Sequence, residues 1–536
     1  MRYSLNMKLA FCLFPFSLAL AQAAPPSEKP VTLYPGLGIW HHQIHTSSAE
    51  AQKFFDQGLA LMYGFNRYEA LRSFRKASEL DPEAAMPYWG IAMAQGPYVN
   101  MDGDAELKMP ASCAAVEAGL KLAGTPEHEQ AYLEAAAKRC PAYQPQLYID
   151  AMRALALRWP DDLDALTLYA ESLLVATRWH WYAADGTPAP GVPEAERTLE
   201  QVLRRWPDHP GANHLYIHAV ESSPTPERAI ASAQRLMGIM PWAGHMVHMP
   251  AHIWQVLGDY EMAATLNERA VAVDREYMTQ SQVTTSGYAA YYVHNLHFVA
   301  YARWMQGRKA DGLRAADEMS AAMAPMLETM PAMADAFNAI AVFGRVRFRD
   351  WDGILNLPEP RSNLHASTAT WHYARALAFA GRGDRVAAAR EQSALEAIRA
   401  ALPAGASWGG YNKAADVFTI ASGIVAARLA ATPAEAVPHL QHAVALQDTL
   451  TYDEPPAWYY PVRESLGASL LLAGKAVEAE SVFREGVKRS PRNGRMLFGL
   501  MESLRAQGKN EDAEWVKREY DAAWSKADVK LKVDEM

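Results

Sequence analysis

Seven histidines lie between His214 and His297, and their spacing is the feature of this chain most able to do chemistry. His214 and His218 are four residues apart, as are His248 and His252, and the second pair follows the first by 34 residues. Residues four apart share one face of a helix. If the two segments are neighbouring parallel helices, four imidazoles meet at one place, where zinc, copper or iron can bind. The spacing therefore predicts a metal site.

The composition predicts an all-α protein with a large core. Half of the 536 residues are hydrophobic and 21% are charged, and alanine-rich stretches outnumber β-branched runs. The formal net charge is −9, and no basic block interrupts the sequence. This charge pattern argues against nucleic acid or an anionic membrane surface as the partner.

Residues 1–23 have the features of a cleavable export signal. Arg2 and Lys8 precede or flank an apolar run from Leu9 to Leu20, and Ala21-Gln22-Ala23 is a small-residue cleavage site. The apolar run is too short to span a bilayer as a helix, so no permanent membrane anchor is expected. We expect the mature protein to be periplasmic or secreted.

Export leaves two cysteines, Cys113 and Cys140. An even number of cysteines in an oxidising compartment favours a disulfide between them. Two buried free thiols are the alternative, and the spacing fits no metal-binding cysteine motif.

A set of small and aromatic residues recurs with the same spacing near both ends of the chain. The first copy is Gly58, Leu61, Ala70, Phe74, Ala77 and Pro82, and a late copy is Gly467, Leu470, Ala479, Phe483, Gly486 and Pro491. Small residues let two helices cross closely, aromatic residues fill the gap between hairpins, and proline ends the second helix. On these residues the chain resembles the tetratricopeptide repeat family, whose period is about 34 residues. The resemblance implies an all-α, right-handed α-solenoid of helix–turn–helix repeats.

The resemblance also sets the expected organisation. A proline-containing lead-in at residues 24–49 precedes a single solenoid domain at 50–524, and a charged tail at 525–536 is expected to fray. Two inserts, at residues 182–193 and 276–290, interrupt the repeats. A solenoid has one continuous core, so the repeats are counted as one domain.

The family resemblance gives the metal site a location. In tetratricopeptide repeats the first helix of each hairpin lines the concave surface, and its positions 2, 5, 9, 12 and 13 usually contact ligand. All seven histidines and one glutamate fall on such positions in three successive helices, which predicts a histidine-rich groove at residues 211–301. The predicted metal ligands are His214, His218, Glu221, His245, His248, His252, His294 and His297. Eight groups exceed the need of one ion, so two ions with open coordination positions are the more economical interpretation.

Other residues are candidates for supporting roles in the groove. Asn213 and Asn295 each precede or follow a histidine and are predicted to hydrogen-bond the ligands. Tyr301 and Glu171 take groove positions in their helices. The first part of the groove is apolar, at Met86 and its neighbours, so a peptide, a protein or an aromatic small molecule is the expected ligand.

Three further features have both a functional and a structural interpretation. His180 and the cluster of His41, His42 and His45 are interpreted as surface or loop groups rather than ligands. The segment 454–461, Glu-Pro-Pro-Ala-Trp-Tyr-Tyr-Pro, could close the groove. A rigid start to a helix, with packed aromatic residues, is the favoured interpretation of this segment.

These observations favour an exported metal-binding protein, with a metal-dependent oxidoreductase using copper or iron as the leading function. Histidine pairs on several helices resemble dicopper oxygen-binding proteins in ligand type only, and zinc also fits. Two alternatives stay open. The chain could be a periplasmic adaptor that binds a peptide or protein and uses its histidines for hydrogen bonds or pH sensitivity. It could also store or deliver metal without catalysis. Chance clustering of seven of the 17 histidines is the alternative to any site.

Overall fold

The structure is a computed structural model that describes residues 29–100, 108–281, 288–329, 331–409 and 411–536. The predicted export signal at residues 1–23 lies outside the described residues. Leu33–Met536 form one compact unit. Within the described ranges, no helix is both long enough and apolar enough to cross a membrane.

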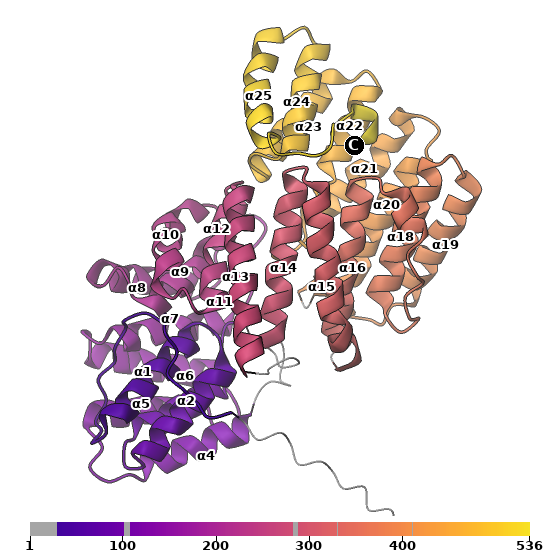
Figure 1. Ribbon diagram of the computed structural model, residues 1–536. Coiled ribbons are helices and arrows are strands. Elements are labelled where there is room, and N and C mark those ends of the chain that lie inside the picture. The colour runs from indigo at the N-terminus through magenta and orange to yellow at the C-terminus, as the bar shows by residue number, and fades with distance from the viewer. Residues whose placement is uncertain (1–28, 101–107, 282–287, 330, 410) are drawn as a thin grey trace, which may run out of the picture. The chain divides into compact units, whose positions relative to one another are not determined.

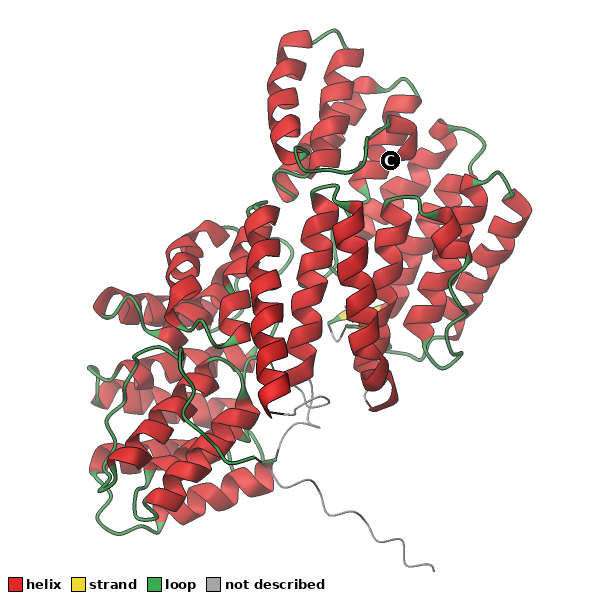
Figure 2. Cartoon of the chain, in the orientation of Figure 1, coloured by secondary structure: helices red, strands yellow, loops and turns green. Residues whose placement is uncertain are grey.

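Almost all of the regular structure is helical (Figure 2). The first half contains α1 (Ala49–Tyr63), α2 (Arg67–Leu80), α3 (Met86–Ala94), α4 (Met109–Leu120), α5 (Glu127–Ala137), α6 (Pro145–Arg158), α7 (Leu163–Ala176), α8 (Val192–Arg205), α9 (Pro210–Glu221), η2 (Pro226–Ala229), α10 (Ile230–Ile239), α11 (Gly244–His248), α12 (Pro250–Val256) and α13 (Tyr260–Ser281). The second half contains α14 (Tyr288–Met305), α15 (Lys309–Thr329), α16 (Pro331–Arg347), α17 (Trp351–Leu355), α18 (His365–Gly381), α19 (Arg385–Ala401), α20 (Ala414–Leu429), α21 (Pro433–Gln447), α22 (Arg463–Leu472), α23 (Ala476–Arg489), α24 (Gly494–Ala506), α25 (Asn510–Ala523) and η3 (Val533–Glu535). The short strands β1 (Ser407–Trp408) and β2 (Asn412–Lys413) pair antiparallel, with Ser407 opposite Lys413.

The helices stack in the order in which they occur along the chain. Each helix packs mainly on the next one, as α1 does on α2, α13 on α14 and α24 on α25 (Figure 1). Many also contact the next helix but one, as α7 contacts α9 and α22 contacts α24. This pattern of stacked helical hairpins is an α-solenoid of tetratricopeptide-like repeats, and it confirms the predicted fold class.

The repeated small residues explain how the hairpins close. A Cβ atom added at Gly58 or Gly90 would come within 2.6 or 2.4 Å of the Phe74 ring. At the other end of the chain, Phe483 lies against Gly467 in the same way, at 2.5 Å. Both phenylalanines are fully buried. The aromatic side chain therefore fills the space that glycine leaves between adjacent helices, as the sequence predicts.

The two predicted inserts differ in structure. The first predicted insert, 182–193, is a loop as far as Gly191, with an isolated bridge between Tyr182 and Pro188, and α8 begins at Val192. The second insert is largely helical, because α13 continues to Ser281 and α14 starts at Tyr288. Residues 282–287, between these helices, lie outside the described residues.

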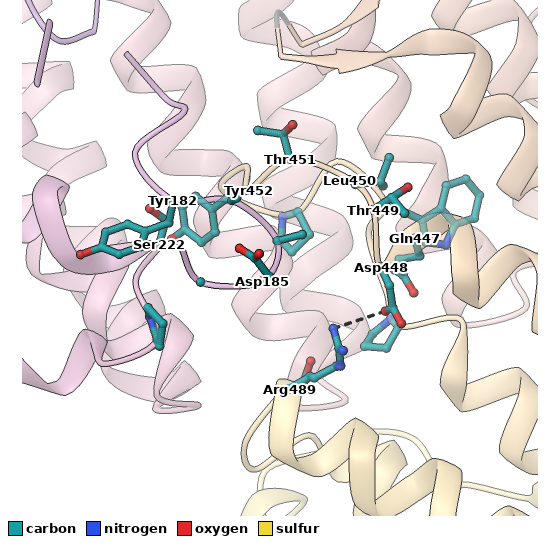
Figure 3. Close-up of a pocket in the computed structure, with 18 of the residues that line it drawn as sticks. Tyr182, Asp185, Ser222, Gln447, Asp448, Thr449, Leu450, Thr451, Tyr452 and Arg489 are labelled. Carbon is teal, nitrogen blue, oxygen red and sulfur yellow. Dashed lines mark ion pairs between the residues drawn. The ribbon is translucent and has the colours of Figure 1, made fainter. Parts of the chain in front are cut away.

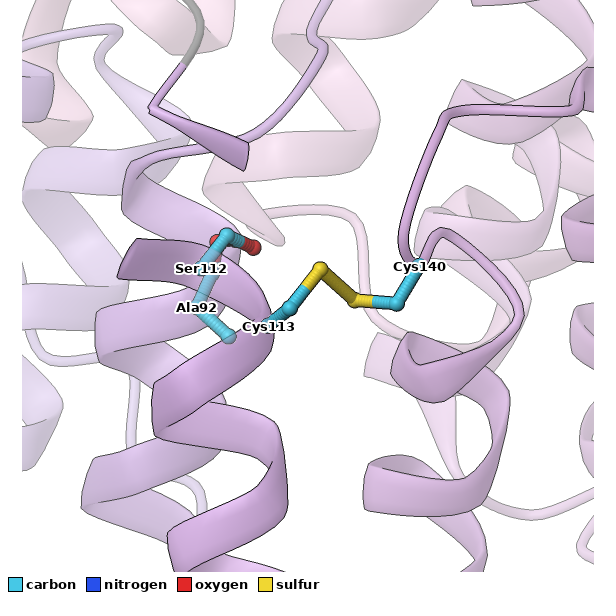
Figure 4. The surroundings of a disulfide bond; sticks show 4 residues. All are labelled: Ala92, Ser112, Cys113 and Cys140. Atoms are coloured by element: carbon cyan, nitrogen blue, oxygen red, sulfur yellow. Dashed lines mark hydrogen bonds between the residues drawn. A yellow bond between two sulfur atoms is a disulfide. The ribbon is translucent and has the colours of Figure 1, made fainter. Parts of the chain in front are cut away.

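A disulfide joins Cys113 in α4 to Cys140, which follows α5, with an S–S distance of 2.06 Å (Figure 4). The two cysteines are 27 residues apart in the sequence. Closing a loop of this length restricts the unfolded chain by about 3–4 kcal/mol. A Cys113→Ser, Cys140→Ser variant is expected to lose that much unfolding free energy in a urea titration. An unchanged transition midpoint would contradict this expectation.

The charged segment 525–536 is held against the solenoid, which corrects the expectation that it frays. The Asp528 carboxylate accepts hydrogen bonds from the backbone N–H groups of Lys309 and Ala310, at 2.7 and 2.9 Å. The Arg428 guanidinium donates to an oxygen of Met536, and the Met536 side chain is 3% exposed. The segment is therefore fixed by hydrogen bonds at its start and by burial at its end.

Removal of residues 525–536 is expected to destabilise the protein. The burial of Met536 alone is worth about 1.5–3 kcal/mol, and the hydrogen bonds to Asp528 and Arg428 add to it. Chemical denaturation of the shortened chain should show this loss. The matched control is Lys530→Ala, which changes an exposed side chain of the same segment and should leave stability unchanged. Equal stability of the shortened and full chains would contradict the docked position.

Candidate metal centre

Six of the predicted histidine ligands converge from four helices. His214 and His218 are on α9, His245 and His248 on α11, His252 on α12 and His294 on α14. The sequence predicts one helix through residues 245–252, but the structure divides it between Met249 and Pro250. Proline has no backbone N–H to continue the hydrogen bonding of α11, and it instead occupies the first position of α12.

The six histidines form two triads. The first triad is His214, His218 and His245, and the second is His248, His252 and His294. Within each triad, one ring nitrogen of every member lies within 4.8 Å of the others. The Nε2 atoms of His214 and His245 are 3.1 Å apart, and those of His248 and His252 are 2.6 Å apart. Each triad thus has the number of imidazoles that one metal ion with an open position requires.

Four of the six histidines have an Nδ1 atom within hydrogen-bond distance of an acceptor. His214 Nδ1 lies 2.6 Å from the carbonyl oxygen of Tyr63, and His248 Nδ1 lies 2.6 Å from Asn267 Oδ1. The Asn267 amide is oriented by its own Nδ2, which donates to the carbonyl of Ala263 at 2.8 Å. These acceptors place the proton on Nδ1 and leave the lone pair on Nε2.

Glu221 is the acceptor for one histidine of each triad. Its Oε1 lies 3.1 Å from His218 Nδ1, and its Oε2 lies 2.6 Å from His252 Nδ1. Metal-binding histidines commonly donate their second N–H to a carboxylate or a carbonyl in this way. Glu221 also belongs, with His252 and Glu454, to a further group whose ligand atoms lie within 4.8 Å of one another, so its predicted role as a ligand stays a prediction.

A second carboxylate, Glu454, was not among the predicted site residues. It precedes α22 in the sequence. Its Oε2 contacts Nδ1 of His252, the ring nitrogen that does not face His248. Neither oxygen of Glu454 has a hydrogen-bond partner that satisfies normal geometry. The only signal in the sequence was the unusual segment 454–461, for which a structural role was favoured. No spacing rule links this segment to the histidines.

The histidines are buried, whereas the sequence predicts them on the concave surface of a groove. His214, His218 and His248 are 0% exposed, and His252 is 2% exposed. His294 is the one member that is partly accessible. Residues outside the histidine-bearing helices contribute to this burial, since Trp179 lies 5.6 Å from the His218 ring and Glu454 contacts His252.

Burial controls the protonation of these groups. Desolvation lowers the pKa of His218 to about 3 and that of His248 to about 4, so both imidazoles are neutral at pH 7. Burial raises the pKa of Glu221 and Glu454 well above the ordinary value, and in Glu454 the charge of Glu221 adds to this shift. Among the described residues, no lysine or arginine contributes to the shift of either carboxyl pKa. Within the part of the chain that the structure describes, no positive side chain therefore offsets the burial of these two carboxyls.

An aromatic ring covers each triad. Phe65 lies 4.4 and 5.2 Å from the rings of His214 and His245, and Phe298 lies 4.7 and 5.0 Å from those of His248 and His252. Phe65 has a φ of 56°, a left-handed conformation that costs a non-glycine residue about 1–2 kcal/mol. Since the strain places the ring over the first triad, it is consistent with a functional constraint on this turn.

A second group of acidic and histidine side chains has the opposite character. His42 and Asp164 form an ion pair at 2.7 Å, and the Asp164 carboxylate also accepts from Tyr63 Oη at 2.5 Å and Trp40 Nε1 at 3.0 Å. Burial lowers the pKa of His42, but the hydrogen bond and charge of Asp164 outweigh it and raise that pKa to about 9. The charges in this group are already compensated. It fixes the end of α1, where the Tyr63 carbonyl receives the His214 proton.

Several predicted residues lie away from the two triads. His297 belongs to neither, and its ring packs 5.3 Å from Tyr459. Asn213 donates to the carbonyls of Pro207 and His209, and Asn295 donates to Asp274, so neither orients a ligand. Glu171 interacts electrostatically with Arg67 and Arg139 instead of with the histidines, and Tyr301 is buried beside Tyr459. Position within a repeat does not fix which neighbour a side chain contacts.

No protein-family model and no curated protein matches the chain. Among solved structures, the human IFIT1 dimer with m7Gppp-AAAA is 11% identical, over 91% of this chain and 92% of that one, with a TM-score of 0.32. Yeast Tom70 is 12% identical, over 87% of this chain and 96% of that one, also with a TM-score of 0.32. The Naa15/Naa10 complex bound to HypK-THB is 12% identical, over 89% and 90% of the two chains, with a TM-score of 0.23. At this level, the likeness transfers no ligand or activity to this chain.

Proposed function

We propose that this chain is a metal-binding protein that holds two ions in the paired histidine triads. The first triad, His214, His218 and His245, would hold one ion. The second triad, His248, His252 and His294, would hold the other. Glu221 would orient a ligand of each ion, and with Glu454 it would supply negative charge. We further propose that the protein is exported and that the centre works as an oxidoreductase with copper or iron.

The observation that supports this proposal is the distance of 2.6 Å between the Nε2 atoms of His248 and His252. His248 donates its Nδ1 proton to Asn267 and His252 donates its own to a carboxylate, so neither Nε2 carries a proton. Two lone pairs at this distance repel, and burial without a positive charge nearby keeps the two neighbouring carboxyl groups from ionising. A bound cation removes both costs, whereas the His42 group needs none because its charges are already paired.

Copper and iron both accept imidazole ligands and change oxidation state, which is the chemistry that the bound ions would supply. The protein groups have separate tasks. Tyr63, Asn267 and Glu221 fix the imidazole tautomers, and the rings of Phe65 and Phe298 keep water away from the ligands. Zinc suits the same ligands without redox chemistry, so the identity of the metal decides between these activities.

Metal analysis of the purified chain tests the proposal. The protein is purified anaerobically with copper, iron or zinc supplied, and bound metal is measured by mass spectrometry after gel filtration. We expect about two ions per chain, retained on dilution, and optical changes on reduction and reoxidation with the native metal. Absence of stoichiometric metal under all three conditions would refute the metal site. Rapid loading and release of several ions would instead support storage or delivery.

Metal binding is expected to release protons from the carboxyl groups and not from the imidazoles. The pKa values of His218 and His248 are already about 3 and 4, so these rings hold no proton to release at pH 7. The pKa values of Glu221 and Glu454 are raised, so the apparent metal affinity should increase with pH as these carboxyls ionise. Calorimetry in two buffers with different ionisation enthalpies measures the released protons. Affinity that depends on pH only near 6.5, the range of ordinary imidazoles, would contradict this assignment.

A further inference from the structure

A cavity of about 280 Å³ is lined by residues of α16, α18, α20, α22 and α24 and by the end of the segment 525–536. We call it the arginine cavity, because its wall includes Arg347, Arg349, Arg428 and Arg495. None of its lining residues belongs to either histidine triad. A ligand bound here is therefore independent of the candidate metal centre and goes beyond the proposed function.

Positive side chains outnumber negative ones on the wall of the arginine cavity. Among the residues that the structure describes, the acidic side chains of this wall are Glu464 and Glu535, so the four arginines leave two positive charges in excess. Arg347 and Arg495 share the Glu464 carboxylate, at 3.0 and 2.7 Å. Because one carboxylate cannot neutralise two guanidinium groups, this part of the wall stays positive.

The charged groups next to this wall do not cancel the excess. Asp534 interacts electrostatically with Arg428, and Lys532 lies 3.2 Å from Glu535, so the charges of Asp534 and Lys532 offset each other. An α-carboxylate at Met536 would lower the excess to one positive charge. A cleft lined by one sign of charge attracts ions of the opposite sign, so the arginine cavity favours an anion.

A larger cavity, of about 1010 Å³, has a different balance of charge (Figure 3). The figure shows Asp448 paired with Arg489, and these side chains are 3.4 Å apart. Besides His180, its wall carries three acidic and three basic side chains, which are Asp185, Asp448, Glu485, Arg463, Lys488 and Arg489. Equal numbers of acidic and basic groups select no sign of charge, so an anion is expected in the arginine cavity and not in the larger one.

Arg349 and Arg428 are the arginines that a ligand can reach. The Arg349 side chain is 34% exposed, and Arg428 is also exposed. Arg349 lies 3.5 Å from Glu535, and Arg428 donates a hydrogen bond to an oxygen of Met536. A guanidinium group has five N–H donors, so these contacts leave donors for a bound molecule. Since the two arginines also repel each other, an anion between them is favoured.

The backbone at Arg349 supports a role for its side chain. Arg349 follows the end of α16 with a φ of 54°, a left-handed conformation that glycine adopts most easily. Its guanidinium lies 5.6 Å from the centre of the Trp351 ring, which also lines the cavity. Glycine would avoid the strain but would remove this positive charge from the wall, so the strain is consistent with a functional constraint.

We propose that the arginine cavity binds a small phosphate-bearing anion. The planar guanidinium group matches the oxygens of phosphate, and Arg349 and Arg428 would supply these contacts. The Ser465 hydroxyl also lines the cavity and can donate a further hydrogen bond. The volume lies just below the range of about 300–1,000 Å³ that is usual for sites of organic ligands. Inorganic phosphate or a small phosphate monoester therefore fits.

Isothermal titration calorimetry of the full chain at pH 8 tests this inference, with inorganic phosphate and glycerol 3-phosphate as ligands. We expect saturable binding of one phosphate group per chain at low ionic strength. Arg349→Gln and Arg428→Gln should each weaken binding at least tenfold, because each removes a charged hydrogen-bond donor. Phosphate should raise the melting temperature of the wild-type protein above its value in sodium chloride of equal ionic strength. This rise should be absent in the two variants.

The matched control is Arg382→Gln. Arg382 follows α18 and its side chain is 45% exposed, but it pairs with Asp352 and does not line the cavity. This variant should bind phosphate as the wild-type protein does. Protein freed of metal by a chelator should also bind it equally, because the cavity contains no residue of the triads.

Four results would overturn the inference: no saturable binding of either compound to the wild-type protein, normal binding by both cavity variants, equal weakening by Arg382→Gln, or loss of binding on removal of metal. Tighter binding of succinate than of phosphate would also overturn it, because the cavity would then be a carboxylate site. Tighter binding of glycerol 3-phosphate than of phosphate would support the inference and identify a phosphate monoester as the ligand. Equal or tighter binding of inorganic phosphate would support it and identify the free ion.

Discussion

A His252→Ala variant is expected to bind about one metal ion fewer per chain than the wild-type protein. His252 contributes its Nε2 to the second triad, where it faces His248, and its Nδ1 links that triad to both buried carboxylates. Removing a partner of a metal ligand already weakens binding about 10–100-fold, so removing the ligand itself should exceed that range. His218→Ala should remove the other ion, because His218 belongs to the first triad. Mass spectrometry of the loaded variants measures both losses.

Two other histidines provide matched controls for this experiment. His297 is as deeply buried as the ligands but belongs to neither triad, and His439 is exposed on α21. His297→Ala and His439→Ala should therefore retain two ions. The two-triad assignment would be wrong if His297→Ala lost an ion, or if His218→Ala and His252→Ala each retained both.

Glu454→Gln is expected to have opposite effects on the metal-free and the metal-loaded protein. Burial and the charge of Glu221 raise the pKa of Glu454, so ionising this carboxyl costs the folded state free energy. A carboxyl with a raised folded pKa stabilises the fold below its unfolded value of about 4.5 and loses that contribution as the pH rises. The metal-free glutamine variant should thus be about 1–3 kcal/mol more stable at pH 8, with a smaller gain towards pH 5. The loss of its charge should weaken metal binding at least tenfold.

Glu464 is the matched control, because it is as buried as Glu454 but lies beside positive charges instead of a second carboxyl group. It pairs with Arg347 at 3.0 Å and with Arg495 at 2.7 Å, and although burial raises its pKa, these two charges outweigh the burial and lower it. Glu464→Gln leaves two buried arginines without their counter-charge and should cost about 3–5 kcal/mol. Metal binding should be unchanged in this variant. Denaturant titrations that show Glu454→Gln to be as destabilising as Glu464→Gln would mean that Glu454 is a structural residue.

The helices and the histidine-bearing faces follow from local sequence patterns. Spacings of three and four residues place side chains on one helical face, and the repeat period places equivalent faces side by side, so His214, His218 and His248 could be paired in advance. The glycine and aromatic positions likewise follow the repeat, as Gly58 and Phe74 demonstrate. These features depend on contacts between residues that are close in sequence or in adjacent hairpins.

Features that depend on distant segments could not be predicted from spacing. Pro250 interrupts the predicted continuous helix, because proline starts a new helix, α12, at this position. The Tyr63 carbonyl reaches His214 only because α1 packs against α9, with seven helices between them along the chain. Asn267, which hydrogen-bonds His248, is not next to any histidine in the sequence and was not predicted. Asn213 and Asn295 were predicted because each is adjacent to a histidine, but they hydrogen-bond other groups. Sequence adjacency says little about side-chain direction.

By itself, the sequence determined an all-α repeat protein and seven histidines on matching helix faces, because helical periodicity and the repeat period are local properties. Only the tertiary structure decided that six of these histidines divide into two triads and that Glu221 lies within hydrogen-bond distance of one histidine in each. It also decided that Glu454 closes the centre and that the centre is buried. These outcomes depend on loops folding back across the repeats, where burial and desolvation act on residues that no spacing connects.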